Sequence, residues 1–397
     1  MRISSSTLSR YTSQDMMKYQ LEIADLQSQI SSGKQLQKPS DDPVNAARQV
    51  NLSQNLSQID QYNRNINLAE ARLSNEESHI ANTENVLLRV RELALISNNS
   101  ATTDEVYPAL AAELEQLSAD LLAQANATDP DGDFLFAGTK TSTRPFSPGS
   151  PDVYLGDDQQ RMIQVNQSHQ MATSDSGKDI FMRIPASDKS HTIDIDTSNT
   201  GSASILLTND GTGPNPGTTR YALEFPTSGT YSITNLDTGA AEVTGAAIPE
   251  SNTIEHAGLQ LSITGAPNPN DRFNLEPTIQ QDVFKTLDKF IELLNSPPQS
   301  AAEKAVHRHK LNEIMINVDQ AFEHMTLKRA DIGSRLASLE HILQENESIG
   351  FTLNVTLSGI EDLDYADAIS KLQHQATALE ALQKTITRTQ GLSLFSS

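Results

Sequence analysis

Apolar residues near both ends of the chain recur at the three- and four-residue steps that mark one face of an α-helix. Such a seam, with two apolar positions in every seven, is typical of a coiled coil. Its members are Met16, Tyr19, Ile23, Leu26 and Ile30 near the start, and Ile369, Leu372, Ala376, Leu379 and Ile386 near the end. A narrow seam does not stabilise a helix alone. The two ends are therefore expected to pair with each other or with other copies of the chain, and the pattern leaves both possibilities open.

Longer helices are predicted inside these ends. Residues 44–98 contain neither glycine nor proline. Every seventh position of this stretch is apolar, namely Leu52, Ile59, Ile66, Leu73, Ile80 and Leu87. A strict seven-residue repeat predicts a left-handed supercoil. The companions Asn63, Glu77 and Glu84 are polar, so one face is expected to stay in contact with water. The ends of the further predicted helices are Asn126, the residue before Pro297, and Gly350.

The predicted helix boundaries carry recognisable signals. Gly33 suits the position after the first helix. Asp42, or Ser40 two positions earlier, can cap the next helix. Ser300 and Glu303 have the spacing of a capping box at the start of a later helix.

The middle of the chain, residues 139–277, is rich in Thr, Ser, Gly, Pro, Asn and Asp and carries short alternating apolar runs. The candidate strands are 162–165, 180–184, 192–195, 204–207, 221–225, 231–233, 259–263 and 272–275. Residues 134–138, just before this region, are predicted to form a further short strand. Many short strands separated by turn residues favour a β sandwich or a barrel.

The predicted fold class is α+β, with long coiled-coil-like helical arms from both chain ends and a mostly β domain inserted in the middle. A length of 397 residues is enough for two or three domains. The expected segments are a terminal-helix segment over 1–40, the N-terminal part of a helical rod over 41–140, the β domain over 141–277, the C-terminal part of the rod over 278–350, and a second terminal-helix segment over 351–397. In this arrangement the chain ends lie together.

Charge and composition narrow the possible functions. The net charge of −22 argues against nucleic acid as a partner, because phosphate binding needs clustered Lys and Arg, and it disfavours an anionic membrane surface. The chain has no cysteine, so it uses neither disulfides nor thiolate chemistry. No apolar run approaches membrane-spanning length, and the first residues lack the apolar core of a secretory signal. A cytoplasmic location follows unless another export route exists.

Two histidines, His307 and His309, could suggest a metal site. They lie on different faces of a predicted helix, which favours a solvated face over a metal site. Ser, His and Asp are abundant, but none sits in a recognisable nucleophile motif. The sequence therefore predicts no catalytic, cofactor-binding or metal-binding residue, and no enzyme.

Acidic residues also cluster in two places. The alternate aspartates from Asp129 to Asp133 resemble the start of a calcium loop, but the glycine is misplaced and Lys140 stands where the last ligand belongs. The adjacent Asp41 and Asp42 could be a carboxylate pair for acid–base chemistry, but helix capping explains them. Neither cluster is assigned a chemical role.

Several short motifs follow one another in an order found in a known family. They are Ser-Ser-Gly-Lys at 31–34, Pro-Ser-Asp-Asp-Pro at 39–43, Asn126 and Thr128 followed by Phe-Leu-Phe-Ala-Gly-Thr at 134–139, Asp-Ile-Gly-Ser-Arg-Leu at 331–336, Ala-Asp-Ala-Ile at 366–369, and Gly-Leu-Ser-Leu-Phe at 391–395. With these motifs in this nested order, the chain resembles the flagellin superfamily, and within it the hook–filament junction branch. The resemblance covers residues 1–146 and 279–397.

The resemblance implies a structural subunit of the bacterial flagellum, outside the cell at the hook–filament junction. It implies a ring of copies with an adjacent hook-associated protein on the hook side and flagellin on the filament side. It also implies export through the flagellar type III channel without a cleavable signal peptide, and a cytoplasmic export chaperone on the C-terminal helix. The expected assembly interface is Met16, Tyr19, Ile23, Leu26, Ile30, Ile369, Leu372, Leu379, Ile386, Leu394 and Phe395.

Two alternatives stay open. One is flagellin itself, the filament subunit of the same superfamily, and the other is a coiled-coil stalk that displays the β domain as an adhesin. The motifs at 39–43 and 134–138 favour the junction branch, since flagellins tend to have alanines after the paired acids.

Overall fold

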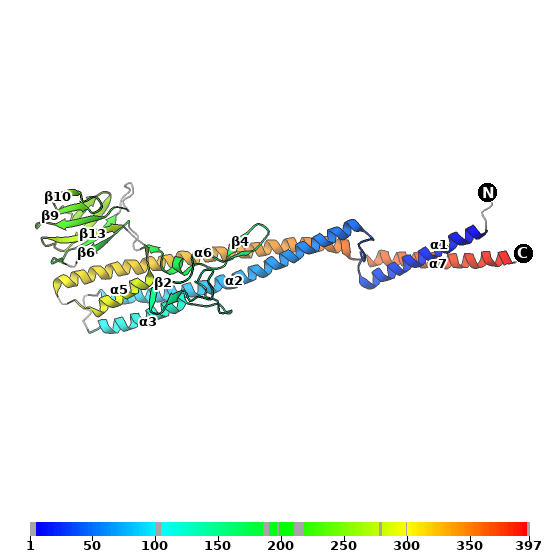
Figure 1. The fold of residues 1–397 in the computed structure, drawn as a ribbon, viewed down its shortest axis with the longest axis horizontal. Coiled ribbons are helices and arrows are strands. Elements are labelled where there is room, and N and C mark those ends of the chain that lie inside the picture. The colour runs from blue at the N-terminus through cyan, green and yellow to red at the C-terminus, as the bar shows by residue number, and fades with distance from the viewer. Residues whose placement is uncertain are drawn as a thin grey trace. The chain divides into compact units, whose positions relative to one another are not determined.

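The computed structural model describes residues 5–99, 105–185, 190–196, 198–209, 218–277, 280–298 and 300–394. The chain divides into two compact units, one made of Met1–Asn65 with His341–Ser397 and the other of Ile66–Glu340. The long helices α2 (Pro43–Ser97) and α6 (Ala301–Glu361) contribute to both units. The fold therefore has the predicted α+β class, with helices at both ends and strands in the middle (Figure 1).

The remaining helices are α1 (Ser5–Ser32), α3 (Tyr107–Ala125), α4 (Gly177–Phe181), α5 (Val283–Asn295) and α7 (Tyr365–Leu394). The strands before the β domain's main sheets are β1 (Phe146–Ser147), β2 (Ser150–Tyr154), β3 (Met162–Gln164), β4 (Gln170–Ala172) and β5 (Ile184–Pro185). The others are β6 (His191–Ile195), β7 (Ser204–Asn209), β8 (Tyr221–Phe225), β9 (Thr230–Asn235), β10 (Ala241–Ala247), β11 (Thr253–His256), β12 (Leu259–Thr264), β13 (Asp271–Pro277) and β14 (Gln280–Gln281).

The predicted helix boundaries are confirmed at three places. Oδ1 of Asp42 accepts hydrogen bonds from the N–H groups of Val44 and Asn45 at 3.1 and 3.0 Å, so Asp42 caps α2. The hydrogen bond from the Asn45 backbone holds the pKa of Asp42 below its usual value. Ser300 and Glu303 form the reciprocal bonds of a capping box, 3.1 and 3.0 Å long. Gly33 follows α1 with a φ of 73°, as a residue after a helix often does.

The prediction that Gly350 ends a helix is wrong, because α6 continues to Glu361. Gly350 is buried, and Cγ2 of Ile59 lies 3.7 Å from the point where a Cβ of Gly350 would stand. Glycine inside a helix costs about 1 kcal/mol relative to alanine. Close packing against α2 offsets a cost of that size, so α6 continues past Gly350 without a break. The segment boundary expected at 350 therefore falls inside a helix.

The seven-residue apolar repeat of α2 is buried in the unit Ile66–Glu340, where Ile66, Leu73, Ile80 and Leu87 are fully covered. The companions predicted to face water divide, because Glu84 is buried whereas Asn63 and Glu77 are only half-buried. A second set of buried residues stands three positions after each repeat residue, namely Ala69, Glu76, Thr83 and Val90. Steps of three and four define a coiled-coil seam, so α2 buries a seam that includes a glutamate.

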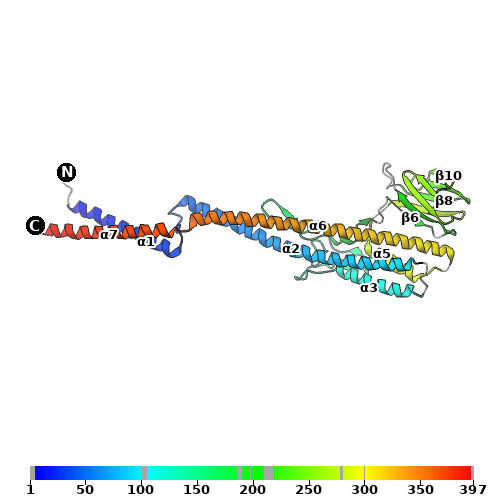
Figure 2. The same cartoon turned by 180° about the vertical axis from the view of Figure 1, so that it is seen from behind.

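Polar pairs join α2 to α6 beside this seam. Arg329 pairs with Glu84 at 2.6 Å and with Glu77 at 3.1 Å. The further pairs are Arg91 with Asp319 at 2.6 Å and Asn98 with Asn312 at 3.2 Å. Rising numbers on α2 meet falling numbers on α6, so the helices run antiparallel (Figures 1 and 2). In the other unit Asn63 and Asn346 form a similar pair at 3.2 Å.

The described residues between His191 and Pro277 form a β sandwich, which decides between the two predicted architectures. One antiparallel sheet has the strand order β10-β9-β8-β13-β6, and the other has β11-β12-β7. Both contribute to one apolar core, which contains Leu223 and Phe273 from the first sheet and Ile205 and Leu261 from the second. Seven of the candidate strands are confirmed, as β3, β6, β7, β8, β9, β12 and β13.

The strand predicted at 180–184 is wrong, because most of this stretch follows the helix α4. The hydroxyl of Ser176 accepts a hydrogen bond from the Lys178 N–H and caps that helix. Ile180 and Phe181 are neighbours and both are buried. A short apolar run of this kind has no periodicity that separates a strand from a buried helix.

The strand predicted at 134–138 is also wrong. Only isolated bridges form there, between Thr128 and Phe134 and between Ala137 and Ser176. The Phe136 ring packs edge-on against Phe181, with 5.3 Å between ring centres. The rings of Phe146 and Phe284 extend this aromatic cluster. Packing of Phe136 into the cluster therefore decides the local backbone, which turns instead of extending.

A Gly138→Ala change is expected to lower the melting temperature of the unit Ile66–Glu340 clearly more than Gly132→Ala. Both glycines have positive φ, 70° and 88°, so each alanine adds about 1–2 kcal/mol of backbone strain. At Gly138 the new Cβ would also overlap the carboxylate and carbonyl oxygens of Asp157, whereas nothing lies within 4 Å at Gly132. Thermal unfolding followed by circular dichroism measures the difference. Equal melting temperatures would show that Asp157 moves aside freely.

Candidate functional site

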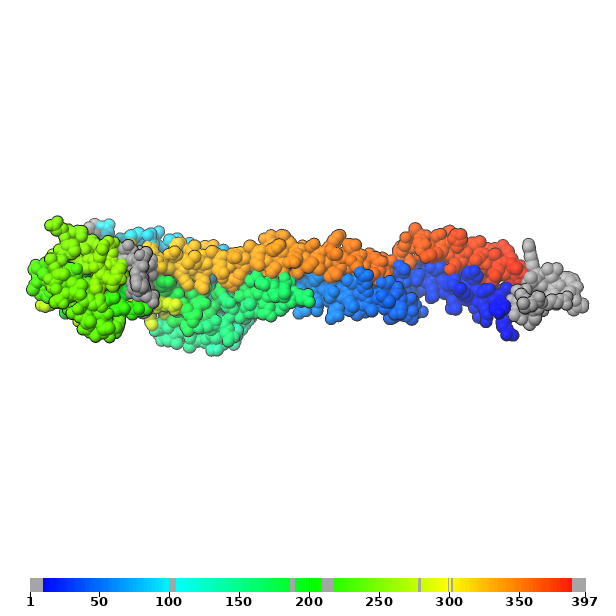
Figure 3. All heavy atoms as spheres, turned by 90° about the horizontal axis from the view of Figure 1, so that it is seen from above, coloured from blue at the N-terminus to red at the C-terminus, as the bar shows by residue number. Residues whose placement is uncertain are grey.

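The terminal helices α1 and α7 run side by side and belong to the same unit (Figures 1 and 2). Figure 3 shows them packed together, in dark blue and red, on the face in view. All five residues of the predicted seam on α1 are half-buried, namely Met16, Tyr19, Ile23, Leu26 and Ile30. The sequence left open whether the two ends pair with each other or with other copies of the chain. In this structure the two ends of one chain pair with each other.

The seam on α7 differs from the predicted one. Its covered positions include Ala368, Leu372, Gln375, Leu379, Leu382 and Ile386, which step by four and three residues. Ile369 is 43% exposed and Ala376 is exposed, so both lie off this seam. Ala368 and Ile369 are adjacent, and only the partner helix decides which of two adjacent positions is covered. Phe395 and the side chain of Leu394 lie outside the described residues.

Apolar side chains remain exposed on both helices outside the seam. On α1, Met17 is 66% and Leu21 is 69% exposed, and they stand one helical turn apart. On α7, Tyr365 joins Ile369 in the same way. Other exposed large apolar residues of this unit are Tyr11, Val44, Val50, Ile349, Phe351 and Val355. Exposed apolar patches mark association surfaces. In the sequence, the signal for Met17 and Leu21 is their place beside the predicted seam.

The two chain connections at one end of the helix pair, after α1 and before α7, are held together. The Gln35 N–H donates to the Glu361 carbonyl at 2.8 Å, and the Leu363 N–H donates to the Gly33 carbonyl at 3.0 Å. Lys34 forms an ion pair with Glu361 across the same contact. The break between α1 and α2 and the break between α6 and α7 therefore lie side by side, where α1 ends and α7 begins.

A buried polar cluster joins α2, α6 and the loops between β4 and α4. Glu76 is 1% exposed, and its Oε1 accepts the Asp175 N–H at 3.0 Å. The Asp175 carboxylate pairs with Arg335 and accepts a hydrogen bond from Gln160 at 2.6 Å. Burial raises the pKa of Glu76 to about 8, nearby Asp175 adds to the rise, and Arg335 opposes it. Sequence reasoning missed this cluster, although Glu76 occupies a seam position between Leu73 and Ile80.

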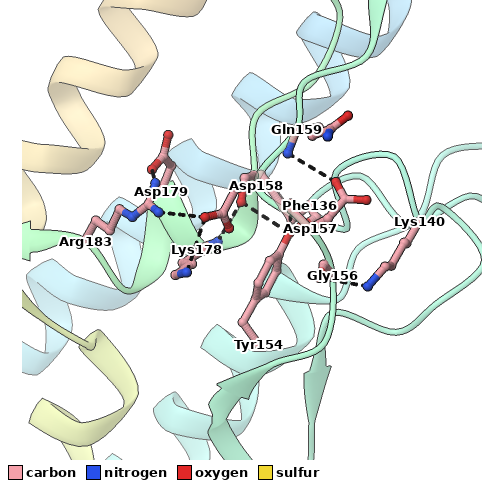
Figure 4. Close-up of polar contacts among 11 residues, drawn as sticks. Phe136, Lys140, Tyr154, Gly156, Asp157, Asp158, Gln159, Lys178, Asp179 and Arg183 are labelled. Carbon is pink, nitrogen blue, oxygen red and sulfur yellow. Dashed lines mark hydrogen bonds and ion pairs between the residues drawn. The ribbon is translucent and has the colours of Figure 1, made fainter.

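A second polar network surrounds the turn at 134–139 (Figure 4). The Tyr154 hydroxyl lies 2.8 Å from the Phe136 carbonyl oxygen and 2.9 Å from that of Asp157. Burial raises the pKa of Tyr154, although a hydrogen bond with Ser176 opposes the rise. Figure 4 also shows Arg183 between Asp158 and Asp179, at 2.7 and 2.5 Å. These contacts connect loops to one another and to α4, so the network serves to hold the turn.

The candidate metal ligands of the sequence have structural partners. His307 is buried beside the Tyr107 ring, with 5.5 Å between ring centres, and His309 contacts the Ile193 carbonyl at 2.9 Å. The expectation of a solvated histidine face is therefore wrong. Oδ1 of Asp129 accepts the N–H groups of Asp131 and Asp133, both at 3.0 Å, which closes a turn. Within the described residues no group of three possible metal ligands occurs.

No helix among the described residues is both long and apolar enough to cross a membrane. Because its exposed apolar side chains mark an association surface, the terminal helix pair is the candidate functional site.

Known proteins resemble the chain along its length. The family "Bacterial flagellin N-terminal helical region" matches residues 3–141. The flagellar hook-associated protein 3 of Escherichia coli K12 is 27% identical over 398 residues, covering 100% of this chain and 99% of that protein. The crystal structure of FlgL from Xanthomonas campestris in space group C2 is 30% identical with a TM-score of 0.70, covering 77% of this chain and 99% of that one.

The crystal structure of flagellar hook-associated protein 3 from Legionella pneumophila is 27% identical with a TM-score of 0.72, covering 78% of this chain and 98% of that one. A likeness at this identity and coverage shows a shared fold and a common origin, and the helical ends and β-rich middle agree among these proteins. The chain therefore belongs to the family of flagellar hook-associated protein 3, also called FlgL.

Proposed function

We propose that this chain is a structural subunit of the bacterial flagellum that forms the junction between hook and filament. One observation carries the proposal, namely the likeness over the full chain to a flagellar hook-associated protein 3. The FlgL structure from Legionella pneumophila, 27% identical, is described as that of a flagellar junction protein. A structural role also agrees with a molecule whose buried polar groups tie its loops and helices together.

The mode of assembly is proposed from the terminal helices. Segments 1–40 and 351–397 contribute the contacts between copies in a ring, and the same ends meet a hook-associated protein on one side and flagellin on the other. Support comes from Met17, Leu21, Tyr365 and Ile369, which are apolar, exposed and outside the seam between α1 and α7. Covering such side chains stabilises an assembly by about 25 cal/mol per Å² of apolar surface removed from water.

Export is proposed to follow the flagellar type III route, with a chaperone that holds α7 in the cytoplasm beforehand. An amphipathic helix with apolar anchors at steps of three and four is the form that helix-binding grooves recognise. The stripe of Leu372, Leu379, Leu382 and Ile386 on α7, with steps of seven, three and four residues, has this form. The protein then acts outside the cell, as part of the flagellum.

Flagellin remains a second candidate, because residues 3–141 match a flagellin region. Immunogold labelling of intact flagella and a copy-number measurement on purified flagella separate the two. A junction subunit gives label only at the hook–filament boundary and the copy number of a single ring. Label along the filament would identify a flagellin, and no label on flagella would leave the adhesin stalk.

A further inference from the structure

Residues 173–176 are buried although all four are polar, namely Thr173, Ser174, Asp175 and Ser176. The segment leads from β4 to α4 and lies against both long helices of its unit. Glu76 of α2 accepts its Asp175 N–H, and Arg335 of α6 pairs with the Asp175 carboxylate. Polar contacts with α2 and α6 therefore fasten this segment, so its stability depends on the charges of those groups.

Two carboxyl groups, Glu76 and Asp175, meet in this contact while they are 1% and 3% exposed. The cations that face Glu76 already have other partners. Arg335 pairs with Asp175 and, at 2.8 Å, with Asp331, and Arg161 lies 3.4 Å from Asp133. On α2 itself, Arg72 lies 3.7 Å from Asp129. An ionised Glu76 would therefore be a buried charge beside a like charge, and it would share Arg335 and Arg161 with the aspartates that already pair with them.

We propose that Glu76 is a proton-dependent switch that fastens residues 173–176 between α2 and α6 while it carries its proton. When the proton leaves to solvent, the Glu76 and Asp175 carboxylates repel each other and the segment opens. Opening releases the loops around the aromatic cluster from both long helices. The contact of residues 173–176 with α2 and α6 is therefore tighter at low pH.

The pH range follows from the two states of the carboxyl group. In the closed segment the pKa of Glu76 is about 8, whereas in the opened segment it returns to its usual value of 4.5. Between these values opening releases one proton. The equilibrium constant for closing therefore falls about tenfold for each pH unit as pH rises through this range. Below about pH 4.5 its stability is fully present, and above about pH 8 it stays constant at its lowest value.

Hydrogen exchange of the full-length protein, followed by mass spectrometry on a peptide that contains residues 173–176, tests the proposal. Rates are corrected for the intrinsic pH dependence of exchange and measured at pH values from 5 to 9. We expect the protection factor of the wild-type segment to fall about tenfold per pH unit up to about pH 8 and then to level off. A protection factor that does not change with pH would overturn the proposal, and this measurement needs no variant.

The variant Glu76→Gln keeps the acceptor for the Asp175 N–H but cannot ionise. It is expected to remove the pH dependence and to leave the segment at least a hundredfold better protected at pH 8 than in the wild type. The control is Glu77→Gln, one residue further on, whose carboxylate is half-exposed and pairs with Arg329. This control should keep the wild-type slope. A slope that survives in Glu76→Gln, or disappears in Glu77→Gln, would assign the titration to another group.

Discussion

Changing Leu372 and Leu379 together to Asp is expected to separate α7 from α1 and to prevent the protein from joining the flagellum. Both side chains are half-buried in the seam between these helices. Burying an apolar side chain of this size is worth about 1.5–3 kcal/mol, and a buried unpaired charge costs more. Because the unit Ile66–Glu340 does not contain these helices, its melting temperature should change by only a few degrees.

Three readouts measure this first prediction. Circular dichroism of the isolated protein should show less helix, the melting temperature of the larger unit should hold, and cells with the variant should secrete flagellin without keeping filaments. The control is His374→Asp with Ala381→Asp, which adds the same charge at the same seven-residue spacing on exposed positions of α7. Loss of filaments with the control as well would show that added negative charge, and not the seam, is responsible.

Two substitutions outside the seam, one on each helix, distinguish the contact between α1 and α7 within one chain from the contacts between copies. Leu21→Asp with Ile369→Asp alters only exposed residues, so the helix content of the isolated protein should stay at its wild-type value. Assembly should still fail, because these side chains are proposed to meet other subunits. Normal filaments with this variant would show that the exposed apolar residues are not the assembly surface.

Arg335→Met is expected to destabilise the unit Ile66–Glu340 by about 3–5 kcal/mol at pH 7, because it leaves the Asp175 carboxylate buried without its cation. The methionine replaces most of the apolar stem, so the lost charge is the main change. Arg91→Met removes an ion pair to Asp319 in which both side chains are nearly half exposed, and it should cost at most about 1 kcal/mol. Urea unfolding followed by circular dichroism compares the two variants. Equal shifts of the unfolding midpoint would mean that the buried pair contributes no more than an exposed one.

Local signals in the sequence were sufficient wherever neighbouring residues alone decide the structure. Asp42 and the pair Ser300–Glu303 cap their helices through bonds that span two or three residues. The repeat from Ile66 to Leu87 predicted the buried side of α2, because side chains seven positions apart share one face of a supercoiled helix. Most strands of the sandwich were predicted for a similar reason, since alternation and turn residues are visible in short windows.

Contacts between distant residues decided the features that local patterns could not. Gly350 stays helical because it packs against Ile59. Residues 180 and 181 form the end of helix α4 instead of a strand, because Phe181 joins an aromatic cluster. The choice of Ala368 over Ile369 for the α7 seam depends on the position of α1. Sequence motifs indicated the right family for residues 134–139, but the turn there depends on Asp157 and on the packing of Phe136.

The candidate assembly site was thus predicted in its place along the chain but only partly in its residues. The sequence by itself determined that both ends are amphipathic helices, since periodicity is a property of one segment. Only the tertiary structure decided that these helices cover each other, which leaves Met17, Leu21 and Ile369 in water. It also decided that Glu76 is buried beside Asp175, because the free energy of a charged group depends on the neighbours that folding brings to it.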